Sequence, residues 1–403
     1  MAGTAVVGAG NYIVEVDIGE PALADITTGI NFLTVKRGRQ DIGDQFSAGT
    51  MSFTILDVAG LFNPFDDQSI YYNSTEGQYG LAPLRRVQFA RFSSLNVKEF
   101  LFKGVIVNYE YNFALGGLDT VTVYCADDFY LLSQTTLKEF NVTQELSSAR
   151  LSAVLDLPEV DYPATRDIAT GTQTLGGTAA FTVPEGTNVL AYCTQINDAE
   201  QGRLFMARDG DLTFDSRIGS TLSAAVADFH DDGTNTPYSS VNVTFEADQV
   251  VNRAAVAILG SATQQVADDA ASQAKYFIQS TSITGSLLHD DPSALALASY
   301  LLEPEPEARY TSLGVNLNML TTAQRDTVAI VDIGQTITIE KTFPSGIGTT
   351  EFAQELSVEG IEHTLSVSTG HSITFFTAPT TIIYELILDD LVYGRIDENN
   401  VLG

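Results

Sequence analysis

The feature that most constrains the fold of this chain is the alternation of apolar and polar residues over short segments. In GTMSFTIL, Met51, Phe53 and Ile55 fall on one face of an extended strand, with Ser and Thr between them. A period of two predicts a β-strand with one buried face. Further segments of this kind are NYIVEVDI, RRVQFARF, FLFKGVIVNYEYNF and DTVTVYCADDF. The first 130 residues therefore predict a β-rich unit, a barrel or a sandwich.

The middle of the chain, residues 131–239, predicts a small α+β insert. SSARLSAVLDL is typical of a short helix capped by Ser147 or Ser148. A second helix, capped by Thr187 or Asn188, is indicated by apolar residues at helical spacing in VLAYCTQI. Directly afterwards, LFMA and LTF flank RDGD, which predicts a hairpin.

Residues 240–378 return to strand patterns and predict a second β-rich unit with one inserted helix. The strand segments include SSVNVTFEA, NRAAVAIL, AKYFIQST and TVAIVDIGQTITIEK. The helix is expected in DPSALALASYLL, with Asp291 as N-cap and Pro292 in its first turn. The remaining segment, residues 379–403, is too short and polar for a domain, and it predicts a C-terminal docking arm.

The chain is strongly acidic. Its 403 residues include 20 Lys and Arg against 51 Asp and Glu, for a formal net charge of −31. Such a surface repels nucleic acid and anionic lipid. A solubilising or salt-adapted surface is the alternative explanation for the charge. The N-terminal segment lacks the basic start of a signal peptide, and no segment reaches the ~20 apolar residues that cross a bilayer. We expect a protein made inside a cell, without a membrane anchor.

Residues suited to catalysis or metal binding are few. No two of the four histidines have the spacing of a helical zinc site. Cys125 and Cys193 lie in apolar settings typical of packed thiols, although a bridge between them stays open. The acidic segment at 231–235 lacks the distal glutamate of a calcium loop and predicts a polar turn. We expect no cofactor, no metal and no enzyme activity. Counting does not exclude a glycosidase pair of carboxylates, but the absence of Trp argues against one.

A basic cluster stands just before the strand at 50–57, in VKRGRQDIGDQFSAGTMSFTILDVAGLFNPFD. In order along it come Arg37-Gly38-Arg39, Asp44, Phe46, Ala48-Gly49-Thr50 and Gly60-Leu61-Phe62-Asn63-Pro64. This order resembles the N-terminal signature of minor tail proteins from long-tailed (siphovirus-type) bacteriophages. YGLAPLRRVQF, VTVYCADDFYLLS, AEQGRLFMARDGDLTF, DIGQTITIEK and LDDLVYGRIDENNVLG are similar to later segments of that family. The resemblance spans nearly the whole chain and departs from the family pattern after Tyr276.

The resemblance implies a baseplate hub, or tail-tip hub, in the virion. Such a hub would be mainly β with small α+β inserts, and would hold two tail-tube-like β-barrel domains in one chain. The barrels would occupy 1–130 and 240–378, so that a homotrimer matches the hexameric tube ring above. Implied partners are other copies of the chain, the distal tail or tube ring protein, the C-terminus of the tape-measure protein, and downstream tip or fibre proteins. DNA would pass through the channel without specific binding during genome ejection.

Two sets of residues are candidates for assembly contacts. Basic residues in an acidic protein are suited to face acidic groups across a subunit or ring boundary, and the C-terminal arm joins an apolar run to acids. The candidates are Lys36, Arg37, Arg39, Arg85, Arg86, Tyr384, Leu386, Leu388, Asp389 and Asp390. The alternatives are a solvated loop for the basic cluster and packing on its own domain for the arm. An acidic channel wall is a further expectation from the net charge.

Other functions stay open at this stage. A distal tail ring protein or a fibre adaptor would also be a structural component of a tail. A tail-tip cell-wall hydrolase would need a catalytic constellation, and the sequence offers none. Host receptor binding is a third alternative, for a chain at the outermost tip.

Overall fold

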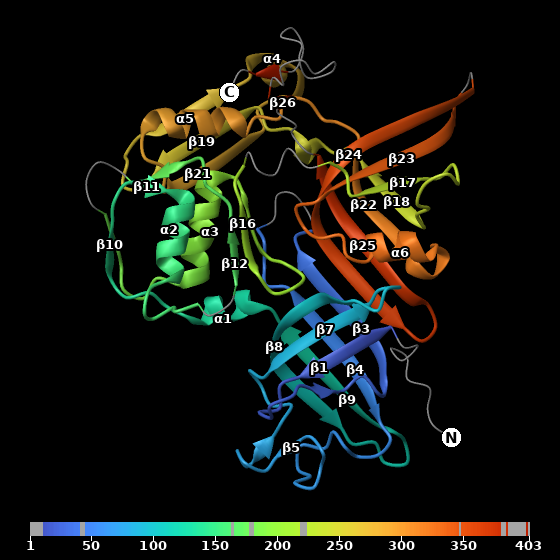
Figure 1. Cartoon of the computed structure of the whole chain (residues 1–403). Helices are drawn as coiled ribbons and strands as arrows, with labels where there is room; N and C mark the ends of the chain where they lie inside the picture. Colours follow the sequence, from blue (N-terminus) through green and yellow to red (C-terminus); the bar gives the residue numbers. More distant parts are fainter. Residues whose placement is uncertain are drawn as a thin grey trace.

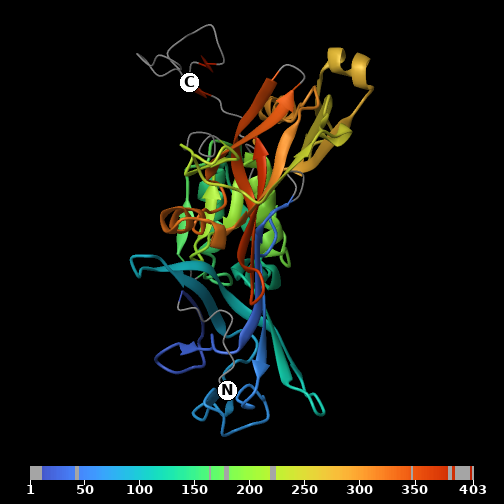
Figure 2. The same cartoon turned by 90° about the vertical axis from the view of Figure 1, so that its right-hand side faces the viewer.

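The computed structural model describes residues 11–40, 45–162, 165–176, 181–217, 224–345, 348–379, 384–385 and 400–401. The chain is mainly β with a few helices, which confirms the predicted class. Figure 1 shows a first β unit, a second β unit and an α+β unit beside them. In Figure 2, as in Figure 1, the first β unit (blue to teal) lies below the second (orange to red).

The first β unit is built from the alternating segments. Its strands are β1 (Tyr12–Val16), β2 (Ala24–Asp25), β3 (Ile30–Gly38), β4 (Thr50–Asp57), β5 (Tyr72–Asn73), β6 (Gln78–Tyr79), β7 (Arg86–Phe92), β8 (Lys98–Asn112) and β9 (Asp119–Ala126). β4 buries Met51, Phe53 and Ile55, as its pattern predicts. These side chains pack with apolar residues of β1, β3, β7, β8 and β9 in one core, because each strand turns its apolar face inward.

The second β unit follows much later in the sequence. Its strands are β17 (Ala227–His230), β18 (Ser240–Thr244), β22 (Arg309–Asn316), β23 (Thr336–Ser345), β24 (Gly348–Ser366) and β25 (Gly370–Pro379). Helix α6 (Thr322–Val328) begins with a capping box made by Thr321 and Gln324. A separate apolar core, which includes Phe229, Leu313 and Phe375, fills this unit.

The two β units repeat one strand order. Neighbouring strands run β1, β7, β8, β9, β4, β3 in the first unit and β17, β23, β24, β25, β22, β18 in the second. The corresponding strands also follow one another in the same order along the chain. Neighbours are antiparallel in both units, except that β17 and β23 are parallel. Pairing of β3 with β24 joins the units into one sheet of 13 strands. The sheet branches at β24, because β23 and β3 pair with successive parts of that strand.

The α+β unit packs helices on short strands. Its main helices are α1 (Asp128–Gln134), α2 (Ser147–Leu155), α3 (Val189–Glu200) and α5 (Asp291–Tyr300). One three-stranded sheet has the order β12 (Arg166–Ile168), β16 (Leu212–Asp215), β15 (Arg203–Met206). A second three-stranded sheet has the order β20 (Gln264–Asp268), β19 (Arg253–Ile258), β21 (Ser280–Ser286). Smaller elements are β10 (Phe140–Val142), β11 (Glu145–Leu146), β13 (Thr174–Leu175), β14 (Phe181–Val183) and α4 (Ala270–Tyr276). The predicted hairpin around RDGD is β15 and β16. Cys193 is buried in this unit, Cys125 is buried in the first β unit, and both thiols are free, which confirms packed thiols.

Apolar packing crosses the boundary that the sequence suggests at residue 240. Ala254, Val256, Leu288 and Leu297 belong to the same core as α2 and α3. Residues 253–302 therefore pack with the α+β unit, although they lie inside the segment expected to form the second barrel. The domain boundaries at 130, 239 and 378 stay a prediction, whereas the three cores are observed.

Several local predictions are wrong in detail. The N-cap of α5 is Asp290 rather than Asp291, because the Asp290 carboxylate accepts the backbone N–H of Ser293 at 2.9 Å. Neither predicted serine caps α2, whose N-cap Leu146 makes no side-chain hydrogen bond. The segment expected as a strand at 274–281 instead ends helix α4 and starts β21 only at Ser280. Asn188 does cap α3, as one of the two predicted alternatives.

Candidate functional site

The two β units meet along β3 and β24. Residues Phe32–Gly38 pair antiparallel with Gly360–Ser366, so β3 is an inner strand of the joined sheet. The backbones approach closely at Gly360, where a Cβ atom would lie 2.2 Å from the carbonyl oxygen of Arg39. Only glycine fits this position, because any side chain would push the two strands apart.

An arginine junction closes one end of this seam. We use this name for Arg37, Arg39 and Arg203 with the carboxylates of Asp332 and Glu359. Arg37 pairs through Nη1 with Asp332 Oδ1 at 2.7 Å and donates to the carbonyl oxygen of Met206 at 3.3 Å. Arg37 lies on the inward face of β3, and its side chain is only 2% exposed.

Glu359 is the centre of the arginine junction. Its Oε2 accepts hydrogen bonds from Arg39 Nε at 3.0 Å and Nη2 at 2.8 Å, so two donors of one guanidinium group meet a single carboxylate oxygen. Its Oε1 accepts from Arg203 Nε at 3.1 Å and from Ser357 Oγ at 2.9 Å. Arg39 follows β3, Glu359 lies in β24, and Arg203 begins β15 of the α+β unit. One buried carboxylate therefore holds parts of all three units together.

The other basic candidates also pair within the chain. Lys36 faces Glu362 across the strands at 3.3 Å, with 52% of its side chain exposed. Arg85 forms an ion pair with Glu76, and Arg86 with Asp128. Acidic partners were expected on another subunit, and in the structure these partners belong to the same chain. The burial of Arg37 leaves it almost no surface to offer a second subunit, whereas a role of the exposed Lys36 at an interface stays a prediction.

The arm candidates are only partly described. Tyr384 lies in the short strand β26 (Tyr384–Glu385), which pairs with β27 (Asn400–Val401). Leu386, Leu388, Asp389 and Asp390 lie outside the described residues, as does Asp44 of the N-terminal signature.

Two buried histidines lie in the same seam. His363 Nδ1 and His371 Nε2 are 3.0 Å apart, and His371 Nδ1 lies 2.8 Å from the Tyr12 hydroxyl. Burial lowers the pKa of His371 to about 3 and holds that of His363 well below its usual value. Burial also raises the pKa of Tyr12 to about 12. All three groups are therefore neutral near pH 7, and they link β1, β25 and β24 through polar contacts rather than charge.

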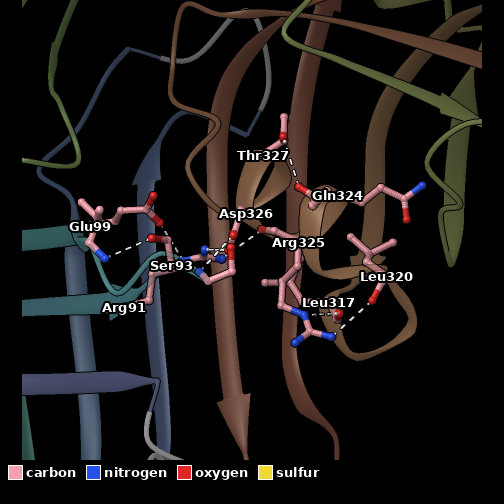
Figure 3. A network of polar contacts seen from close by, with 12 residues as sticks. Arg91, Ser93, Glu99, Leu317, Leu320, Gln324, Arg325, Asp326 and Thr327 are labelled. Atoms are coloured by element: carbon pink, nitrogen blue, oxygen red, sulfur yellow. Dashed lines mark hydrogen bonds and ion pairs between the residues drawn. The ribbon is translucent and has the colours of Figure 1, made fainter.

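A second ionic contact connects α6 to the first β unit (Figure 3). Arg91 of β7, whose side chain is buried, pairs with Asp326 of α6 and with Glu99 of β8, the latter at 2.8 Å. Arg91 also donates to the carbonyl oxygen of Arg325 at 3.0 Å, and the backbone N–H of Ser94 donates to Asp326 at 3.0 Å. A small polar cavity of about 290 Å³ lies beside these residues. The contact fixes the second unit on the first through α6 and β7, in addition to the pairing of β3 with β24.

Comparison with solved structures finds proteins that match over nearly the whole chain. The chain aligns with the tail protein from Neisseria meningitidis MC58 at a TM-score of 0.59 and 13% identity, over 91% of this chain and 96% of that one. The 43 kDa tail protein of prophage MuSo2 from Shewanella oneidensis matches at a TM-score of 0.59 and 9% identity, over 92% and 98% of the chains. Prophage tail protein gp18 from Listeria monocytogenes EGD-e matches at a TM-score of 0.51 and 7% identity, over 92% and 95%. This chain has the fold of phage tail proteins. No family model and no curated protein matches its sequence.

This phage tail fold shows no cluster suited to metal chemistry in the part of the chain that the structure describes. No group of three or more His, Cys, Asp or Glu side chains there is placed to hold a metal ion. The predicted polar turn at 231–235 is confirmed, since Asp232 accepts the backbone N–H of Thr234 at 2.9 Å. No helix of the described residues is both long and apolar enough to span a membrane. The arginine junction and the strand seam are thus the best-defined sites, and both hold the units together.

Proposed function

We propose that this protein is a structural component of a phage tail tip, a hub ring that joins the end of the tail tube to the tip or fibre proteins. The observation that carries the proposal is the internal repeat of two β units in a chain with the phage tail-protein fold. Two similar units in each chain allow three copies to present six units to a sixfold tube. A ring of this kind needs heterologous contacts between copies, in which different surfaces meet.

The arginine junction supports a role as a rigid ring component. A ring subunit has to keep its two β units at a constant angle, or the ring cannot match the tube. Removing one partner of a buried ion pair costs about 3–5 kcal/mol, so a paired junction resists separation of the units. The Arg91 contact adds a second ionic link between the two β units.

The outward face of the joined sheet is suited to a channel wall. On β4 and β9 the residues that alternate with the buried ones are mostly hydroxyl-bearing: Thr50, Ser52, Thr54, Leu56, Thr120, Thr122 and Tyr124. Side chains of this kind carry no positive charge that would hold DNA phosphates by counterion release. Lys36, the basic residue on the same face of β3, is paired with Glu362. We propose that this face lines the channel, and that DNA passes it without specific binding. The acidic wall expected from the net charge of −31 stays a prediction.

A reconstruction of intact tails tests the proposal directly. We expect three copies of the chain in one ring between the tube end and the tip proteins. Six copies would instead indicate a distal tail ring, and copies attached to the outside of the tail would indicate a fibre adaptor. Absence from the tail would refute the proposal. A cell-wall zymogram of the purified chain tests the hydrolase alternative, and we expect no clearing.

The proposed role assigns the C-terminal arm, residues 379–403, to a neighbouring copy or a downstream tip protein. Truncation after Ala378 should leave the ring intact and prevent attachment of the next tip component. Tails completed normally by the truncated chain would show that the arm packs on its own domain.

A further inference from the structure

Because the two β units repeat one strand order, the strands β3 and β24 that join them have counterparts, β18 and β8. Each of these counterparts has an edge that no described strand pairs with. β8 and β24 occupy corresponding places, and each is interrupted by a bulge, between Ile106 and Asn108 in β8 and between Val358 and Gly360 in β24. After its bulge, β24 pairs with β25 on one side and with β3 on the other. β8 pairs with β9 after its bulge, and no described strand pairs with its other side.

The second open edge belongs to β18. β18 corresponds to β3, because each pairs with the strand that follows it in its own unit, β22 or β4. The outer side of β3 meets β24, whereas β18 ends the 13-stranded sheet. The chain therefore has an unpaired counterpart of β3, which is β18, and an unpaired counterpart of the end of β24, which is the end of β8. Since β3 and β24 pair with each other within the chain, their counterparts are suited to pair in the same way.

The pairing registers give the residue correspondence. Ser52 of β4 pairs with Thr34 and Tyr124, and Ser312 of β22 pairs with Asn242 and Phe376. Asn242 thus takes the place of Thr34. The register of β18 with β22 shifts between Asn242 and Val243, where Thr311 of β22 has no partner in β18. Beyond Asn242 the correspondence therefore follows the alternation of β18 itself, which puts Val243 at the position of Val35 and Phe245, the residue after the end of β18, at that of Arg37. In the same way, Tyr109 and Tyr111 of β8 take the places of Ile361 and His363.

Exposure of these positions shows what the free edge lacks. Val35 and Arg37 are 0% and 5% exposed beneath the seam, whereas Val243 and Phe245 are 51% and 68% exposed. Two neighbouring apolar side chains on an open strand edge are a liability for a soluble monomer unless a partner covers them.

We propose that β18 of one copy pairs antiparallel with Asn108–Asn112 of β8 in the next copy. The inference rests on the proposed ring. In the register of the β3 and β24 seam, Phe245 lies opposite Tyr109, Val243 opposite Tyr111, and Thr244 opposite Glu110. Aromatic and β-branched residues opposite each other stabilise strand pairs. The contact is heterologous, as a ring requires, and in the proposed ring of three copies it lets one sheet run continuously from copy to copy.

The seam between copies differs from the seam within the chain in its chemistry. Phe245 stands where Arg37 pairs with Asp332, and Val107 stands where Glu359 accepts two arginines. The ion pairs of the internal junction thus have no counterpart between copies. The internal seam is locked ionically, and the seam between copies depends on strand hydrogen bonds and apolar side chains.

A charge-swap experiment on the full chain tests the pairing. Thr244→Glu places a carboxylate opposite Glu110, which should weaken each seam roughly fivefold, because like charges directly opposite destabilise a strand pair. Adding Glu110→Lys should restore association. Thr263→Glu, in an exposed loop of the α+β unit, is the matched control and should assemble as wild type does. Sedimentation velocity over a concentration series reports the oligomer, and circular dichroism reports the fold of each variant.

Cysteine cross-linking gives an independent readout. The double variant Thr244→Cys and Glu110→Cys should form a covalent trimer on oxidation, whereas each single variant should not, because the native thiols are buried. A trimer that survives Thr244→Glu and fails to cross-link would overturn the pairing while leaving the ring standing. A chain that stays monomeric at every concentration would also overturn it. The proposed function is tested separately, by the presence or absence of the chain in the reconstructed tail.

Discussion

Loss of the Glu359 carboxylate is the sharpest test of the arginine junction. Glu359→Ala removes two hydrogen bonds from Arg39, one from Arg203 and one from Ser357. Both guanidinium groups are largely buried and would lose this anion. Breaking a buried pair by removing one partner costs about 3–5 kcal/mol, and here one carboxylate serves two arginines. We therefore expect the free energy of unfolding to fall by at least about 3 kcal/mol.

Glu362→Ala is the matched control for this prediction. Glu362 lies on the same strand, and its partner Lys36 is about half exposed. An exposed pair contributes only about 0–1 kcal/mol, so this variant should unfold almost as the wild type does. Calorimetry is the suitable assay, because a chain with three cores need not unfold in one step. If Glu359→Ala lost no more stability than Glu362→Ala, the junction would not hold the units together.

Three further perturbations follow from the buried polar groups. Burial lowers the pKa of His371 to about 3, from an ordinary value of 6.5. Between these two values the unfolded chain binds a proton at His371 that the native chain does not bind. The free energy of unfolding therefore falls as the pH falls, by up to about 1.4 kcal/mol per pH unit. His371→Gln should flatten this slope between pH 6.5 and 4, and an unchanged slope would contradict the assignment. Asp127 gives the opposite pH dependence, because burial raises its pKa to about 8. Between pH ~4 and ~8 the native chain keeps a proton on Asp127 that the unfolded chain loses, so the free energy of unfolding falls as the pH rises. Asp127→Asn should remove this fall from denaturation curves measured across that pH range. Asp326→Ala leaves Arg91 with Glu99 and one carbonyl group, so it should cost about 1–3 kcal/mol and speed amide exchange in α6; unchanged exchange there would refute the contact.

The strands of the first β unit could be predicted because their signal is local. β4 buries the residues that alternation places on its apolar face, and β7, β8 and β9 appear where their segments predict them. The helices α1, α4 and α6 were missed. Each has only seven residues, too few for a clear helical period.

The junction residues carried a signal that pattern reading can find. Arg91 shares the inward face of β7 with Val87 and Phe89, and Arg37 shares that of β3 with Leu33 and Val35. A charged residue in phase with buried apolar ones predicts a paired, buried charge, since an unpaired one is too costly. The pattern does not name the partner. Asp332 and Glu359 were missed because no local rule connects them to β3.

The sequence alone determined the β class, the strands of the first β unit, the hairpin around RDGD and the resemblance to phage tail proteins. These follow from side-chain period, turn residues and motif order, all of which act over a few neighbouring positions. Only the tertiary structure decided which strands meet and which charges pair, as with Arg39 and Glu359, which are 320 residues apart. Alternation specifies which face of a strand is buried but not which strand lies beside it. That choice depends on the packing of whole units, and it places the basic cluster in a seam inside the chain.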